Sequence, residues 1–197
     1  MSKVLLIASG PSVKQVEDYD WIGNGWTIVA INNAWQVTDK WSYWIRPGDF
    51  KGNKPEPHTL RNDQKIPKRY SPQLLKFGGQ KACGYSITLN AGYWALAELN
   101  PSVMGFLGAD MNYTPDENGK THFYGVGYDI KHNKNGLSDP DRMVDMYGKD
   151  NPNYLRDIYM RLSDKALEHN GCKVVNFSND PNTRLPYPKA KPSDFDL

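Results

Sequence analysis

A turn rich in hydroxyl groups follows the first apolar segment of the chain and is the first candidate for chemistry. The segment 4–8 is apolar and rich in branched residues, and Ser9-Gly10-Pro11-Ser12 follows it directly. Such a run is typical of a strand buried on both faces of a parallel sheet. The backbone N–H groups of a turn that leads into a helix favour phosphate. We therefore expect Ser9, Gly10 and Ser12 to bind a nucleotide, although a plain turn capped by Ser12 explains these residues equally well.

Polar residues also follow the next two predicted strands. Asn32 and Asn33 end the second apolar run, and their amides can bond to a sugar or a base without bringing charge. Arg46 and Asp49 follow the third run. Arginine can pair with a phosphate or a carboxylate, and the aspartate can bond to a ribose or an acceptor hydroxyl. Because parallel strands end at one edge of a sheet, we expect these side chains near the first turn.

A later segment adds residues that are suited to catalysis. Gly108 and Asp110 follow another apolar run, where the glycine permits close approach to a ligand and the aspartate either caps a turn or touches the substrate. Tyr113 can donate a hydrogen bond to a developing phosphate charge. His122 lies in an aromatic segment, and histidine is a natural general base near neutral pH. On spacing alone, an incidental loop histidine is the simpler interpretation.

The elements that must position these residues alternate between strands and helices. A strand–helix alternation predicts a Rossmann-like three-layer α/β sandwich with a mostly parallel sheet, formed by one domain over residues 1–197. Ser86 and Thr88 are both credible N-caps of the first long helix. Residues 47–72 are predicted to be a long loop with a short strand near Ile66, and the polar segment 114–152 is predicted to be a lid. The predicted strands are 3–8, 26–31, 42–45, 103–107 and 173–177, and the predicted helices begin at Val13 and span 91–99 and 154–170.

Composition is typical of a globular protein and narrows the functional classes. The 197 residues are 39% hydrophobic and 23% charged, and the net charge of +2 is too small to imply nucleic acid by itself. Cys83 and Cys172 are the two cysteines, and their spacing does not suggest zinc. The sequence contains no apolar run of membrane length and begins with a predicted core strand. We therefore expect a cytoplasmic protein with reduced thiols.

Several of these segments together resemble bacterial lipooligosaccharide sialyltransferases. The run Lys3–Ser12 is similar to the first strand of that family and its Gly-Pro-Ser turn. Asn32-Asn33 falls where the family has an Asn-Gln pair, and 88–113 is similar to its helix, strand and Gly-Ile-Asp-Phe-Tyr run. Thr121–Gly125 resembles its Ser-His-Tyr-Ile-Gly lid motif, with a weaker match at Pro181–Leu185. Small phage-encoded proteins look similar too.

The resemblance implies a metal-independent glycosyltransferase that needs no cofactor beyond a nucleotide-sugar donor, linked through CMP or UDP. By position, His122 would deprotonate the acceptor hydroxyl and Tyr113 would stabilise the leaving phosphate. Ser9, Asn32 and Thr88 would hold the nucleotide. The expected acceptor is a glycan or a modified nucleobase.

The chain also departs from the family pattern. Ser9 stands where the family has asparagine, and Arg46 stands where it has the asparagine of an Asn-Pro pair. The second phosphate-binding tyrosine of the lid has no direct counterpart, and Tyr124 is its candidate replacement. These differences leave the donor sugar open.

Two other functional classes are compatible with the same pattern. A magnesium-dependent pyrophosphokinase-like enzyme would use Asp49 and Asp110 as metal ligands. A non-catalytic protein would bind a nucleotide or a sugar without turnover. A shared fold does not separate these three classes.

Overall fold

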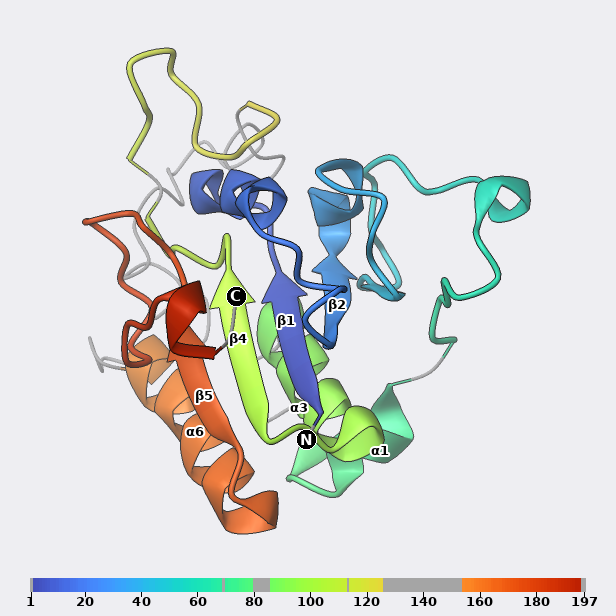
Figure 1. Cartoon of the computed structure of the whole chain (residues 1–197), viewed down its shortest axis with the longest axis vertical. Coiled ribbons are helices and arrows are strands. Elements are labelled where there is room, and N and C mark those ends of the chain that lie inside the picture. Colours follow the sequence, from blue (N-terminus) through green and yellow to red (C-terminus); the bar gives the residue numbers. More distant parts are fainter. Residues whose placement is uncertain (1, 69, 80–85, 113, 126–153, 196–197) are drawn as a thin grey trace.

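The computed structural model describes residues 2–68, 70–79, 86–112, 114–125 and 154–195. Its centre is a five-stranded, all-parallel sheet in the order β3-β2-β1-β4-β5 (Figure 1). This arrangement confirms the predicted α/β class with a Rossmann-like parallel sheet. The strands are β1 (Lys3–Ile7), β2 (Trp26–Ile31), β3 (Tyr43–Ile45), β4 (Val103–Leu107) and β5 (Lys173–Asn176).

Each central strand is apolar on both faces because the sheet is covered on both sides. Side chains alternate between the faces of a strand. In β1, Val4 and Leu6 pack into one core cluster, whereas Leu5 and Ile7 pack into the other. All four side chains are fully buried. The continuous apolar runs in the sequence therefore reflect a three-layer sandwich.

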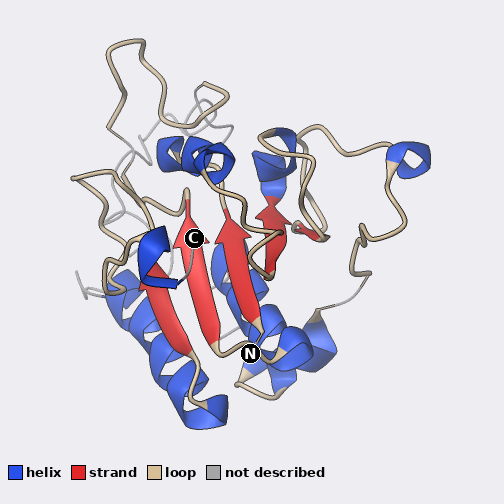
Figure 2. Cartoon of the chain, viewed as in Figure 1, coloured by secondary structure: helices blue, strands red, loops and turns tan. Residues whose placement is uncertain are grey.

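Helices pack against the sheet (Figure 2), and the two faces differ in the kind of helix that covers them. Among the described residues, three α-helices pack on one face, where Leu74, Leu89 and Ile158 join the same cluster as Leu6. Short 3-10 helices contribute to the opposite face. The α-helices are α1 (Ser71–Leu75), α3 (Ile87–Leu99) and α6 (Tyr154–Asn170). The 3-10 helices are η1 (Pro11–Asp18), η2 (Asn32–Gln36), η3 (Pro57–Thr59) and η4 (Pro192–Phe195).

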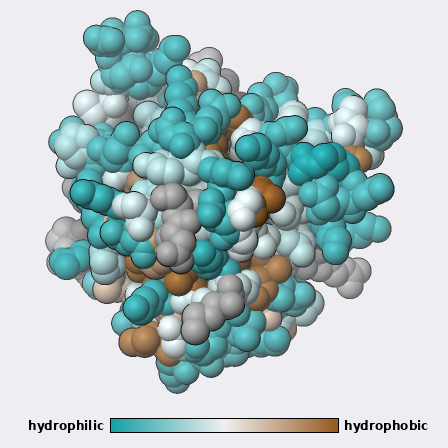
Figure 3. Space-filling model, in the orientation of Figure 1, coloured by the Kyte–Doolittle hydropathy of each residue, from teal (hydrophilic) through white to brown (hydrophobic). Residues whose placement is uncertain are grey.

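Most predicted elements lie where the sequence pattern places them. The strands 26–31 and 103–107 and the helix 154–170 have the predicted bounds, and the other strands are shorter by one residue at one end. Helix α3 begins at Ile87 rather than at residue 91, because Ser86 has the extended backbone of an N-cap. The exposed molecular face in Figure 3 is mostly hydrophilic, with small separate apolar patches.

The connections differ more from the predictions than the core elements do. The helix expected from Val13 is the 3-10 helix η1, which begins at Pro11. Residues 47–72 contain η3 and the start of α1, and the expected strand near Ile66 is a single bridge between Tyr43 and Lys65. The predicted lid is described only up to residue 125, so its remainder lies outside the described residues. No helix in the described ranges is long and apolar enough to cross a membrane.

Gly105 in the middle of β4 provides a test of the packing between the sheet and the C-terminal segment. A Cβ atom at this position would overlap the ring of Phe177, whereas one at Gly48 would meet no atom within 4 Å. Overpacking of a core costs about 1–3 kcal/mol. We expect Gly105→Ala to lower the free energy of unfolding by about that amount in urea denaturation. Gly48→Ala is the matched control and should shift it by less than about 0.5 kcal/mol. Equal stability of the two variants would contradict this packing.

Candidate functional site

The candidate site lies at β1, where the strand order of the sheet switches from one side to the other. From β1 the chain adds β2 and β3 on one side and then returns to place β4 on the other. Open α/β sheets bind ligands at such switch points, outside the carboxyl ends of the strands. Ile7 at the end of β1 is in register with a residue of β2 and one of β4. Ser9, Asn32 and Ala109 each follow that level by two residues and so reach the rim together.

A buried carboxylate holds this rim together. Asp110 is 1% exposed, and its Oδ1 accepts hydrogen bonds from Ser12 Oγ at 2.6 Å and Ser178 Oγ at 2.5 Å. Its Oδ2 accepts a bond from Ser12 N at 3.1 Å, and Ser12 Oγ in turn accepts one from Gly108 N at 2.9 Å. The segments that follow β1, β4 and β5 are therefore tied at one point. Ser178 was not singled out from the sequence, and its only signal is its place after the last strand.

Three amides of the first turn, which were expected to face a phosphate, are paired within the protein. Gly10 N donates to Gly108 O at 2.6 Å, Val13 N donates to Gly10 O at 3.1 Å, and Ser12 N is bonded to Asp110. Pro11 has no N–H group. The Asp110 carboxylate thus occupies the start of η1, where an anionic ligand would otherwise sit. The hydroxyl of Ser12 also bonds to Asp110 rather than capping its own helix.

Both glycines of the rim are explained by this packing rather than by a ligand. A Cβ atom on Gly10 would lie 2.5 Å from Asp110 Oδ2. A Cβ atom on Gly108, whose φ is +72°, would lie 2.5 Å from Ala8 O. The close approach predicted at these positions is therefore an approach between two parts of the protein itself.

Two other polar atoms at the rim take no part in these internal hydrogen bonds. Ser9 Oγ and Asn32 Oδ1 are buried and have no hydrogen-bond partner among the described residues. Asn32 also has a φ of +53°, a left-handed backbone that is uncommon outside glycine. Buried polar atoms are nearly always paired, and strained backbone gathers at functional sites. Ser9 and Asn32 are consequently the residues of the predicted nucleotide set that remain best placed to meet a ligand.

The segment that contains His122 lies against the end of β1. Phe123 N donates a hydrogen bond to Ser9 O at 3.2 Å, although the two residues are far apart in sequence. The segment 114–125 lies on the side to which the strand arrowheads point in Figure 1. His122 Nδ1 and Thr121 Oγ1 are 2.9 Å apart, and this bond orients the imidazole ring. Tyr124 is 41% exposed, with its ring centroid 5.2 Å from that of His122.

Arg46 and Asn33, two of the candidates that follow the second and third strands, contact residues of their own segments. The Arg46 guanidinium lies 5.4 Å from the ring centroid of Trp44 and donates through Nη1 to Pro47 O at 3.1 Å. Asn33 Oδ1 accepts a bond from a side chain one helical turn along η2, at 3.3 Å. Asp49 is exposed in a turn after β3.

The start of α3 lies at the same edge of the sheet. The end of this helix leads into the first residue of β4 at the opposite edge, so the helix and the strand run in opposite directions. Thr88 lies in its first turn and hydrogen-bonds to Tyr159 of α6. Ser86 Oγ is 3.5 Å from the Tyr159 hydroxyl. Burial raises the pKa of the Tyr159 phenol, so this hydroxyl stays protonated at neutral pH. Tyr113, the predicted partner of His122 in catalysis, lies outside the described residues.

The two aspartates considered as magnesium ligands have different surroundings. Both oxygens of Asp110 already accept hydrogen bonds, and its side chain is buried. Asp49 is exposed on a different strand end. The described ranges also contain no group of three acidic, histidine or cysteine side chains that would suit a metal. Burial raises the pKa of the Cys172 thiol to about 12, which makes it a structural thiol, and Cys83 lies outside the described residues.

Comparisons of this chain with protein-family models, with curated proteins and with solved structures find no match. Any functional assignment must therefore come from the site itself.

Asp110 is the residue whose loss should affect stability most directly. Asp110→Ala would leave the two serine hydroxyls and one buried amide without their acceptor, and each unpaired buried group costs about 1–3 kcal/mol. We expect a loss of about 3 kcal/mol in the free energy of unfolding, measured by urea denaturation. Asp49→Ala removes an exposed carboxylate and should change it by less than about 0.5 kcal/mol. If Asp110→Ala were as stable as Asp49→Ala, the rim would not depend on this carboxylate.

Proposed function

We propose that this protein is a glycosyltransferase that moves a sugar from a nucleotide-sugar donor to an acceptor hydroxyl, with His122 as the general base. The observation that carries the proposal is the hydrogen bond from Phe123 N to Ser9 O. The segment bonded in this way contains His122, a histidine in an aromatic loop motif. It lies at the switch point of the sheet, where a nucleotide is expected. The sequence resemblance assigns the same role to His122.

The proposed reaction needs a proton acceptor beside the sugar. His122 would take the proton from the acceptor O–H as that oxygen attacks the anomeric carbon. The bond between the anomeric carbon and the phosphate oxygen breaks, and the nucleotide leaves with the electron pair. If the bond to Thr121 holds hydrogen on Nδ1, the basic lone pair is on Nε2. A positioned base of this kind contributes about 10²–10⁴-fold to the rate.

Side chains rather than turn amides would recognise the donor. The amides of Gly10, Ser12 and Val13 are already paired within the protein. Ser9 Oγ and Asn32 Oδ1 are buried rim atoms that lack a partner in the described ranges, as does Arg46 Nε after β3, and a ribose or phosphate would satisfy them. The partly exposed ring of Tyr124 beside His122 suits contact with a sugar ring or a base. The role of Tyr113 in stabilising the leaving phosphate stays a prediction.

The engaged state of Asp110 favours this proposal over the magnesium-dependent alternative, which needs that carboxylate for the metal. A thermal-shift screen with CMP, UDP, GDP and ATP, each with Mg²⁺ and with EDTA, identifies the nucleotide. We expect stabilisation by CMP or UDP that persists in EDTA. Stabilisation by ATP that requires Mg²⁺ would overturn the proposal. The matching CMP- or UDP-sugar is then assayed for release of nucleotide, with glycan and modified-nucleobase acceptors.

Substitution of His122 tests the catalytic role directly. We expect His122→Ala to lower kcat/KM for nucleotide release by about 10²–10⁴-fold while nucleotide binding is retained. His58→Ala in η3 is the matched control, because His58 is exposed and should leave the rate unchanged. Unchanged turnover in His122→Ala would refute the general-base role. Tight nucleotide binding with no turnover in the natural chain would instead identify a non-catalytic binding protein.

A further inference from the structure

A cavity lies on the face of the sheet that η1 and η2 cover, apart from the Ser9 rim. Its volume is about 520 Å³, within the range of small-molecule sites. The end of η1 contributes Val16 and Glu17, and η2 contributes Trp35. The remaining walls are formed by the segment 37–41 and by residues of the connection between Pro55 and Gln64. No residue of the proposed catalytic site lines this cavity.

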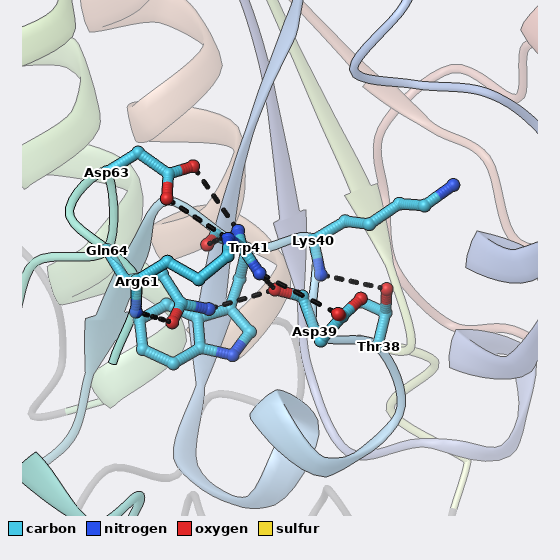
Figure 4. Close-up of polar contacts among 7 residues, drawn as sticks. All are labelled: Thr38, Asp39, Lys40, Trp41, Arg61, Asp63 and Gln64. Atoms are coloured by element: carbon cyan, nitrogen blue, oxygen red, sulfur yellow. Dashed lines mark hydrogen bonds and ion pairs between the residues drawn. The ribbon is translucent and has the colours of Figure 1, made fainter. Parts of the chain in front are cut away.

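The walls of the cavity are held in place without a ligand. Figure 4 shows Arg61 and Gln64 reaching across to the segment 38–41. The Arg61 guanidinium and Gln64 Nε2 both donate to Asp39 O, the latter at 2.9 Å. On another wall, Trp35 Nε1 donates to Asn53 O at 3.0 Å, which fixes the indole ring. Preorganised walls reduce the entropy that a ligand must overcome on binding.

The chemistry of the lining selects a class of ligand. Trp35 is half-buried, and with Trp41 it gives the cavity an aromatic wall. The exposed carboxylates of Glu17 and Asp39 provide acceptors at its edge, where Asp39 also pairs with Arg61 at 3.8 Å. The side-chain amides and hydroxyls of the other lining residues already have hydrogen-bond partners within the protein. Lys40 is the only basic residue among the lining residues, so the cavity lacks a cluster that would favour phosphate. An aromatic face with uncharged and acidic polar groups suits a neutral, polyhydroxylated ring.

We propose that this cavity binds a neutral sugar residue of a carbohydrate chain. The apolar C–H face of the ring packs on the indole of Trp35, and the ring hydroxyls bond to the carboxylates at the edge. This inference goes beyond the proposed glycosyl transfer, because sugar binding here does not require turnover.

The cavity is also placed to assist that transfer. Helix η1 begins directly after Gly10 at the rim, and Val16 and Glu17 in its last turn line the cavity. At about 2 Å rise per residue of a 3-10 helix, the five steps from Pro11 to Val16 span about 10 Å. A glycan of several rings is long enough to occupy the cavity and extend toward the rim. This link, unlike the binding itself, rests on the proposed function.

Isothermal titration calorimetry with four neutral disaccharides tests the proposal. The probes are cellobiose, maltose, lactose and N,N′-diacetylchitobiose. We expect at least one to bind with a Kd on the order of 1 mM. Trp35→Ala should weaken that binding by about tenfold or more, whereas Trp35→Phe, which keeps an aromatic face, should retain most of it. Absence of saturable binding for all four probes would overturn the proposal, as would unchanged affinity in Trp35→Ala.

A second pair of variants guards against a loss of folding in the first. Thr59 is exposed at the cavity, so Thr59→Trp should fill it and abolish binding without altering the core. Leu167→Trp is the matched control on α6, which covers the other face of the sheet, and should bind normally. His122→Ala should also bind the disaccharide normally, so failure of the catalytic proposal would not remove this one. Tighter binding of glucose 6-phosphate than of glucose would contradict the preference for a neutral ring.

Discussion

The structure depends on one buried carboxylate at the edge of the sheet. Asp110 follows β4, yet its oxygens hold Ser12 from the turn after β1 and Ser178 from the segment after β5. A buried carboxylate is tolerated only when it is well bonded, and here three donors meet it. The same residue extends the link through its backbone, because its carbonyl accepts bonds from Arg184 N and Thr183 Oγ1. Three distant stretches of the chain thus share one anchoring point.

This anchor determines what the rim can do. An open α/β sheet commonly presents the amides of its first turn to a phosphate, but here Asp110 occupies that position. The anchor consequently moves the proposed recognition from the backbone to side chains, chiefly Ser9 and Asn32. It also fixes the carbonyl of Ser9 at a defined place, where Phe123 N can bond to it and carry His122 to the rim. Stability and the proposed catalysis are therefore coupled through the same turn.

The two faces of the sheet have different uses in this view. The α-helices of the described residues pack on one face and contribute to the cluster around Leu6 and Leu162. The other face is covered in part by 3-10 helices and by the connection after β3. The cavity beside Trp35 lies in this second layer, between η1, η2 and that connection.

The sequence by itself determined the sheet, its parallel class and helix α6, because hydrophobic periodicity acts over a few neighbouring residues. It also determined that polar residues such as Ser9, Asn32 and Asp110 would follow the strands. Only the tertiary structure decided what those residues contact. The bond of Asp110 to Ser12 spans 98 positions, and that to Ser178 spans 68. Local patterns hold no information on such pairs, so a nucleotide contact and an internal anchor are identical in the sequence. The approach of Phe123 to Ser9 and the cavity beside Trp35 likewise arise only when distant segments pack together.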